Sequence, residues 1–148
     1  MRIYLPLTAP DRASLELAST RLALPAGRAA WAVTASAERD FPGEDLEDLE
    51  YEALQDAVHV AYGAGSSTQR AMVIALDVPD AAIGDADDGG AFGVLLGTSA
   101  SARIASFHVT ELDAAAAEAD DTDPALLWFD VAEAREALAY LDGAEAAG

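Results

Sequence analysis

The stretch AMVIALDV, residues Ala71–Val78, decides the fold expected from this sequence. It is apolar except for Asp77, and β-branched residues lie at its centre, a pattern typical of a strand buried on both faces. Pro79 and Asp80 end it. Because doubly buried strands belong mostly to parallel sheets covered by helices, this stretch indicates an α/β domain.

Helices and strands alternate on the N-terminal side of this stretch. The sequence predicts strands at Arg2–Leu7 and Ala30–Thr34, with a helix between them that carries Leu15 and Leu22. A longer amphipathic helix is predicted over about Glu44–Tyr62. Strands separated by helices usually pair in parallel through right-handed crossovers.

The second half of the chain is more irregular. It predicts strands at about 91–97, 104–110 and 126–129, a short helix at 112–119 and a final helix at 131–141. Thr8 with Asp11, and Asp130 with Glu133, have the spacing of capping boxes. We therefore expect a single α/β domain over residues 1–148, with a mixed, mostly parallel sheet of about five to six strands and a frayed tail at 143–148. The alternative is a ferredoxin-like two-layer α+β sandwich.

The charge balance excludes several classes of function. The chain has 8 Arg, no Lys, 27 Asp and Glu, no Cys and a formal net charge of -19. A disulfide framework or a cysteine zinc site is impossible, and nucleic acids and anionic membranes are poor partners for such a field. No apolar run of 18 residues and no signal-peptide pattern is found, so we expect a cytoplasmic protein.

The absence of Lys and Asn has two explanations. A GC-rich genome depletes both residues and enriches Ala, which makes up about a quarter of the chain. Adaptation to a salty cytoplasm would also favour an acidic surface.

Candidate site residues follow the predicted strands. The carboxyl ends of parallel strands share one edge, where ligands bind in open α/β sheets, and this edge would include Thr34 and Asp77. These side chains could instead only cap and turn the chain. Glu50 lies in the apolar stripe of the long helix, so it requires a partner, for which Arg2 is favoured over Tyr4 and Arg103. Glu50 is therefore either half of an ion pair or a functional carboxylate.

The two histidines allow more than one interpretation. His59 has Glu52 and Asp56 at spacings that could present three ligands, but a solvated helix face has the same pattern, and we predict no metal. His108 is either a hydrogen-bonded histidine of a sheet or a catalytic one. No G-x-S-x-G, Cys or Lys nucleophile and no phosphate-binding glycine motif is found, so the sequence favours a protein that is not an enzyme and uses no cofactor.

Several short motifs occur in an order that resembles a small actinobacterial family of unknown function, DUF6912. They are MRIYLPLT from Met1, AVT before Ala35, EDLEYEAL around Glu50, ALDVPD from Ala75, FHVTE from Phe107 and LLWFD from Leu126. The resemblance implies a GC-rich source and carries no known catalytic residue. It draws attention to Arg2, Tyr4, Glu50, Tyr51 and Trp128, which lie inside these motifs. Residues 80–99 and the segment after Asp130 depart from the family pattern.

The sequence leaves two main functions open, besides a third, an acidic decoy for nucleic-acid-binding surfaces, which would need the carboxylates to lie on one face. The first is a binding module for a protein partner or a second copy of the chain. The alternative is a small-molecule-binding protein or enzyme with a carboxylate site at the carboxyl edge of the strands. The candidate residues for either are Arg2, Tyr4, Thr34, Glu50, Tyr51, Asp77, His108 and Trp128.

Overall fold

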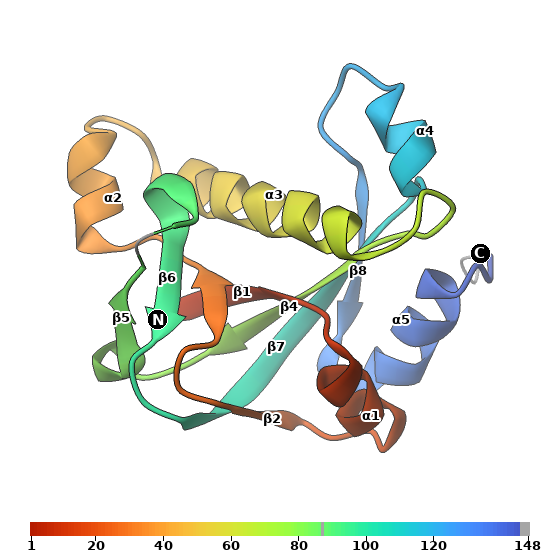
Figure 1. Cartoon of the computed structure of the whole chain (residues 1–148), viewed down its shortest axis with the longest axis horizontal. Helices are drawn as coiled ribbons and strands as arrows, with labels where there is room; N and C mark the ends of the chain where they lie inside the picture. The colour runs from red at the N-terminus through yellow and green to blue at the C-terminus, as the bar shows by residue number, and fades with distance from the viewer. Residues whose placement is uncertain (87, 146–148) are drawn as a thin grey trace.

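The chain folds around one antiparallel sheet of eight strands (Figure 1). The computed structural model describes residues 1–86 and 88–145. The strands are β1 (Arg2–Pro6), β2 (Arg21–Leu24), β3 (Ala29–Trp31), β4 (Met72–Asp77), β5 (Ile83–Asp85), β6 (Gly93–Leu96), β7 (Ala100–Thr110) and β8 (Leu126–Asp130). The helices are α1 (Ala9–Glu16), α2 (Ala35–Asp40), α3 (Leu46–Ala64), α4 (Ala114–Glu118) and α5 (Ala134–Leu141), with short 3-10 turns η1 (Asp80–Ala82), η2 (Gly90–Phe92) and η3 (Val131–Glu133).

The predicted α/β class with a mostly parallel sheet of about five to six strands is wrong, because the fold is α+β and every strand pair is antiparallel. The strand order is β2-β7-β4-β1-β3-β6-β5, and β8 pairs with β7 beside β2. Strands β3 and β4 do run in the same direction and are joined through α3. They are not neighbours, however, because β1 lies between them and pairs with both.

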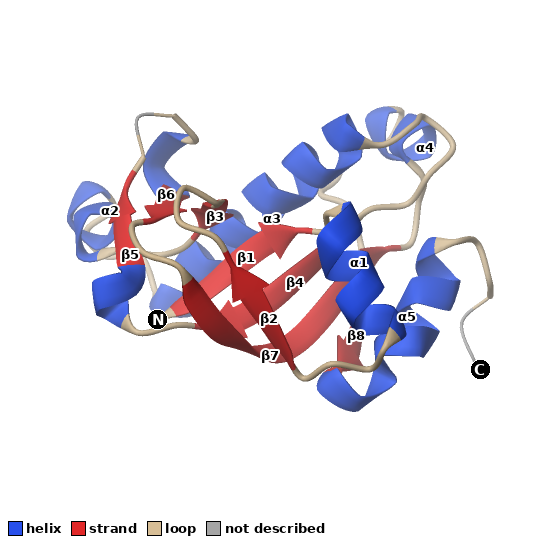
Figure 2. Ribbon diagram, turned by 60° about the horizontal axis from the view of Figure 1, so that its bottom comes forward, coloured by secondary structure: helices blue, strands red, loops and turns tan. Residues whose placement is uncertain are grey.

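The central strand β4 is buried on both faces, as its sequence predicts, because helices cover the sheet on both sides. Figure 1 shows α3 above the sheet and α1 and α5 below it; Figure 2 shows α1 and α5 in front of the strands. Ile74 and Leu76 face the α1 and α5 side, whereas Val73 and Ala75 face α3. A strand between two helical layers is apolar whatever the direction of its neighbours.

One predicted helix is too long. Helix α1 ends at Glu16, Ala18 adopts a φ of 57°, and residues 21–24 form β2 against β7. In this strand Leu22 and Leu24 are buried while Arg21 and Ala23 are exposed, which is the alternation of a strand with one buried face.

Two charged side chains fix α1 to the sheet. Asp11 is 4% exposed and binds Arg28 at 2.8 Å, and it also accepts from the main-chain N–H of Thr8. The predicted capping boxes at Thr8 and Asp130 are both present. Of the predicted frayed tail, Ala144 accepts a hydrogen bond from Arg70, and residues 146–148 lie outside the described part of the chain. Within that part no helix is long and apolar enough to cross a membrane.

Candidate functional site

One face of the sheet, next to α3, carries most of the polar residues selected from the sequence. The register places Arg2 opposite Asp77, Val73 opposite His108, and His108 opposite Trp128. Paired residues of neighbouring strands project to the same face, so these side chains lie in adjacent rows. Tyr4 is in the same set, since it is opposite Ala75, which is opposite Ser106.

Arg2 is paired with Asp77 and not with Glu50. Its Nε and Nη2 atoms donate to the two carboxylate oxygens of Asp77 at 2.8 and 3.3 Å. The hydrogen bond from Arg2 holds the pKa of Asp77 below its usual value. Both side chains are partly exposed, so the pair positions β1 against β4 and contributes little stability.

Glu50 is bound by a tyrosine. The Tyr4 hydroxyl donates to its Oε2 atom at 3.2 Å, which links β1 to the N-terminal half of α3. Burial raises the pKa of Tyr4, and the negative charge of Glu50 raises it further, so the phenol stays protonated and remains the donor. The expected pairing of Glu50 with Arg2 is therefore wrong, and Tyr4, one of the other candidates, is the partner.

His108 forms a pair with Ser106 on the same strand. The Ser106 Oγ and His108 Nε2 atoms are 3.0 Å apart. Burial, together with the positive charge of Arg2, lowers the pKa of His108 to about 4. The ring is therefore neutral at pH 7, as in a hydrogen-bonded histidine of a sheet.

The exposed flank of α3 is attached to the segment that leads into β8. The Tyr51 hydroxyl donates to Asp123 at 3.3 Å, and Gln55 Nε2 donates to Tyr51 and to the carbonyl of Pro124. Gln55 is 6% exposed, and its Oε1 atom has no partner among the described residues. No sequence pattern indicated Gln55, because a single glutamine on a helix is usually solvent-exposed.

Trp128 is the most exposed aromatic residue in this region, with 61% of its surface accessible. Its strand, β8, pairs with β7 on one side, and no strand within residues 1–86 and 88–145 pairs with its other side. The N–H of Thr110 donates to the carbonyl of Ala71, just before β4, whereas the N–H of the next residue, Glu111, donates to the carbonyl of Ala125, just before β8. Antiparallel pairs alternate in this way, so the main-chain N–H and C=O groups of Leu126 and Trp128 point to the open edge of β8.

Thr34 and the second histidine lie outside this arrangement. Thr34 is the N-cap of α2, and its hydroxyl accepts from Ala37 N at 3.1 Å. Thr34 and Asp77 follow β3 and β4, which end at the same side of the sheet with β1 between them, but the Thr34 hydroxyl caps α2 while Asp77 is bound by Arg2. His59 is on an exposed part of α3, and no group of three or more metal-ligating side chains occurs within residues 1–86 and 88–145.

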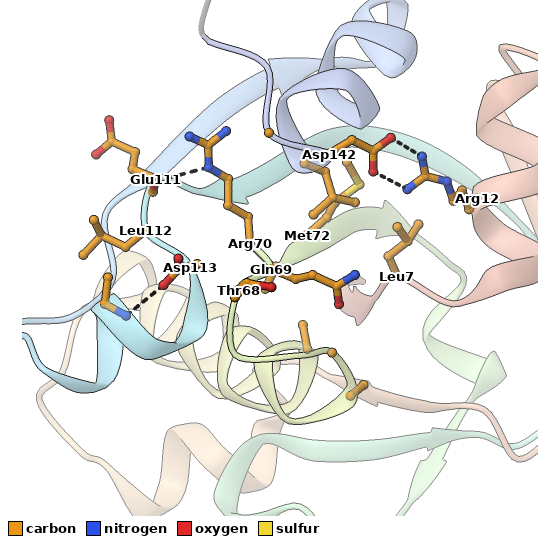
Figure 3. A pocket seen from close by; sticks show the side chains of 17 residues that line it. Leu7, Arg12, Thr68, Gln69, Arg70, Met72, Glu111, Leu112, Asp113 and Asp142 are labelled. Carbon is orange, nitrogen blue, oxygen red and sulfur yellow. Dashed lines mark hydrogen bonds and ion pairs between the residues drawn. The ribbon is translucent and has the colours of Figure 1, made fainter.

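A pocket of about 610 Å³ lies elsewhere, where the C-terminal ends of α3 and α5 approach the start of β4 (Figure 3). Figure 3 shows Gln69 extending toward Leu7, with Arg12 and Asp142 on one side of the pocket and Leu112 and Asp113 on the other. No sequence pattern indicated it, because its walls come from six separate segments. Its lining includes Leu7, Ala64, Arg70, Met72, Glu111 and Leu112.

A model of a family of unknown function, DUF6912, matches residues 1–141 of the chain. No curated protein and no solved structure matches it.

Proposed function

We propose that this chain, which belongs to the family of unknown function DUF6912, is a protein-binding module that adds an extended basic segment to the open edge of β8. The observation that carries the proposal is the unpaired edge of a strand whose central residue, Trp128, is 61% exposed. The partner is expected in the same compartment as this chain, for which we propose the cytoplasm.

The main chain of β8 supplies the affinity in this proposal. An open sheet edge presents free N–H and C=O groups, and proteins commonly shorten, charge or cover such edges because another chain can pair there. The central residues of β8, Leu126 to Phe129, are all apolar. An added strand would bond to the outward groups of Leu126 and Trp128, as in other cases of strand addition.

The side chains of β8 favour a partner segment in which cationic and aliphatic residues alternate. Leu127 and Phe129 pack against the core on the α5 side, while Trp128 and Asp130 lie on the opposite face. A cationic side chain on the added strand would lie near Asp130 and over the Trp128 ring, and an apolar one would extend the other face. The expected partner therefore alternates Arg or Lys with aliphatic residues.

The charge around β8 selects a basic partner over a second copy. From Ile104 to Ala134 the chain has eight acidic residues and no Arg or Lys. They are Glu111, Asp113, Glu118, Asp120, Asp121, Asp123, Asp130 and Glu133. Two copies would each bring a net charge of -19 to the interface, whereas a basic segment is attracted and oriented by this field.

The test is the binding of two short peptides to the full chain. A fluorescently labelled Arg-Val-Arg-Val-Arg-Val-Arg peptide is expected to bind in an anisotropy titration, and the Glu-Val counterpart is expected not to bind. Trp128→Thr should weaken binding about 5- to 30-fold, which corresponds to a loss of about 1–2 kcal/mol of cation–π and packing energy. Leu17→Ala, at an exposed leucine on α1's C-terminal end, is the control and should bind as the wild type does.

Equal binding of both peptides, or an unchanged affinity in Trp128→Thr, would contradict the proposal. Light scattering of the free chain tests whether a second copy occupies the edge instead. If the chain is a dimer and Trp128→Thr makes it a monomer, the edge of β8 binds a second copy and not a basic segment.

A further inference from the structure

Strand β2 lies on the same edge of the sheet as β8. Both strands pair with β7, β2 with residues 100–103 and β8 with residues 106–110, while β4 occupies the other side of β7. The two short strands therefore follow one another along β7 and run in the same direction. In the described part of the chain, no strand pairs with the outer side of β2. The open edge of β8 thus continues onto β2.

The main chain of β2 is open on this edge as well. The N–H of Ile104 donates to the carbonyl of Thr20, so Thr20 and every second residue after it bond to β7. Because bonded and non-bonded pairs alternate in an antiparallel ladder, the N–H and C=O groups of Arg21 and Ala23 point outward. A segment that adds to β8 and continues along the edge can therefore bond to β2 too.

Two arginines lie next to each other on this part of the edge. Arg21 is opposite Arg103 in a pair without main-chain hydrogen bonds, the arrangement in which side chains are closest, and both are exposed. The Nε and Nη2 atoms of Arg21 donate to the hydroxyl and carbonyl oxygens of Ser101, which carry no charge. Neither arginine forms an ion pair with any of the described residues. Like charges at opposite positions destabilise a sheet, so an anion would stabilise this pair.

The carboxylate in the same row of the sheet is already bound. Asp77 is opposite Arg103 on β4, but both of its oxygens accept from Arg2. The segments that build this half of the edge are free of acidic residues, since residues 17–37 and 89–110 contain three Arg and no Asp or Glu. The edge is therefore positive at β2 and acidic at β8, in a chain whose net charge is -19.

A β-bulge places the two halves of the edge on one face. Strand β7 has one extra residue, Ala105, where it pairs with β4. Arg103 and Ser106 are three residues apart in sequence, and because of the extra residue they project to the same face. Their partners, Arg21 on β2 and Asp130 on β8, therefore also lie on one face, about two strand positions apart. A single extended segment can contact both with alternate side chains.

We infer that the partner segment continues from β8 onto β2 and carries an acidic side chain that binds the guanidinium groups of Arg21 and Arg103. This inference rests on the proposed strand addition at β8. Antiparallel pairing is the commoner and slightly more stable arrangement, and a segment antiparallel to both strands passes Arg21 before it passes Asp130. The acidic residue therefore precedes the basic residues in the partner's sequence.

Two peptides of identical composition and opposite order test the inference on the full chain. One is Glu-Val-Glu-Val-Arg-Val-Arg-Val-Arg, and the other has the same residues in reverse; both are capped at the two ends, so they have the same length and net charge. In anisotropy titrations the acid-first peptide is expected to bind about 2- to 5-fold more tightly than the acid-last peptide, the range of one or two cross-strand ion pairs.

Matched variants locate the preference. Arg21→Gln and Arg103→Gln should each reduce the preference for the acid-first peptide, and the double variant should abolish it. Arg39→Gln, which makes the same charge change on exposed α2, should retain it. In hydrogen exchange of the wild type, the acid-first peptide should slow the Arg21 and Ala23 amides in addition to those of β8.

The outcomes separate this inference from the proposed function. If the Arg-Val peptide binds but the two orders bind equally, the extension onto β2 is wrong and strand addition at β8 stands. The extension is also wrong if the preference survives in the double variant or if the Arg21 and Ala23 amides exchange as fast as in the free chain. If none of the three peptides binds, both are wrong.

Discussion

At the residue scale, the α3 face of the sheet is built from hydrogen-bonded pairs. Arg2 binds Asp77, Tyr4 binds Glu50, and Ser106 binds His108. The sequence could predict that Glu50 needs a partner, because it occupies an apolar stripe. It could not identify the partner, since Arg2 and Tyr4 lie two residues apart on one strand and only the sheet register places Asp77 beside Arg2.

His108 makes stability depend on pH. Its pKa is about 4 in the folded chain and about 6.5 when unfolded, so between these values the unfolded state binds more protons. Stability is therefore fully present above pH 6.5 and decreases as the pH falls toward 4. From pH 7 to pH 5 the loss due to His108 is about 2 kcal/mol.

Urea unfolding at pH 7, 6 and 5 measures this loss. His108→Asn should remove about 2 kcal/mol of the decrease relative to the wild type, and His59→Asn makes the same chemical change on exposed α3 as the control. Parallel curves for wild type and His108→Asn would show that the ring is not buried as described.

At the element scale, local chemistry was easier to predict than pairing. The capping boxes at Thr8 and Asp130 are confirmed, and α3 lies within two residues of its predicted bounds. The prediction that the first helix extends to Leu22 is wrong. Leu22 fits both the apolar stripe of a helix and the buried face of a strand, and it lies in β2. Only β7, far along the chain, decides between the two.

Helix α3 can approach the sheet closely because small residues face it. Ala53 and Ala57 are both 0% exposed against Tyr4, Val73 and Ala75. Ala57→Leu should destabilise the chain by about 1–3 kcal/mol, since extra methyl groups have no space there. Ala64→Leu, in the exposed last turn of the same helix, should change stability by less than about 0.5 kcal/mol. Denaturant unfolding of both variants measures the difference, and equal stabilities would mean that the interface is loosely packed.

At the scale of the whole molecule, the acidic charge constrains both stability and partners. The described ion pairs use three of the eight arginines and the N-terminus, whereas the sequence has 27 Asp and Glu against 8 Arg. The charge could be counted from the sequence, and its exclusion of nucleic acids stays a prediction. The direction of the strands could not be inferred from the sequence. An apolar run indicates that helices cover both faces of a strand, but it does not indicate whether the neighbouring strands are parallel or antiparallel to it.

Repulsion among the carboxylates predicts a stabilising effect of salt. Raising NaCl from 20 mM to 0.5 M shortens the screening length from roughly 20 Å to about 4 Å, which weakens this repulsion more than it weakens the few surface ion pairs. The thermal unfolding midpoint should therefore rise. NaCl is preferred to sulfate, which also strengthens apolar burial. A midpoint that falls with NaCl would show that the ion pairs outweigh the repulsion.

The most direct test of strand addition is amide hydrogen exchange along β8, with and without the Arg-Val peptide. In the free chain Leu127 and Phe129, which pair with β7, should exchange slowly, and Leu126 and Trp128, which face the open edge, should exchange fast. Bound peptide should slow exchange at Leu126 and Trp128 and leave the other two amides slow. Peptide binding that leaves the Leu126 and Trp128 amides fast would contradict the proposal that β8 is the binding edge.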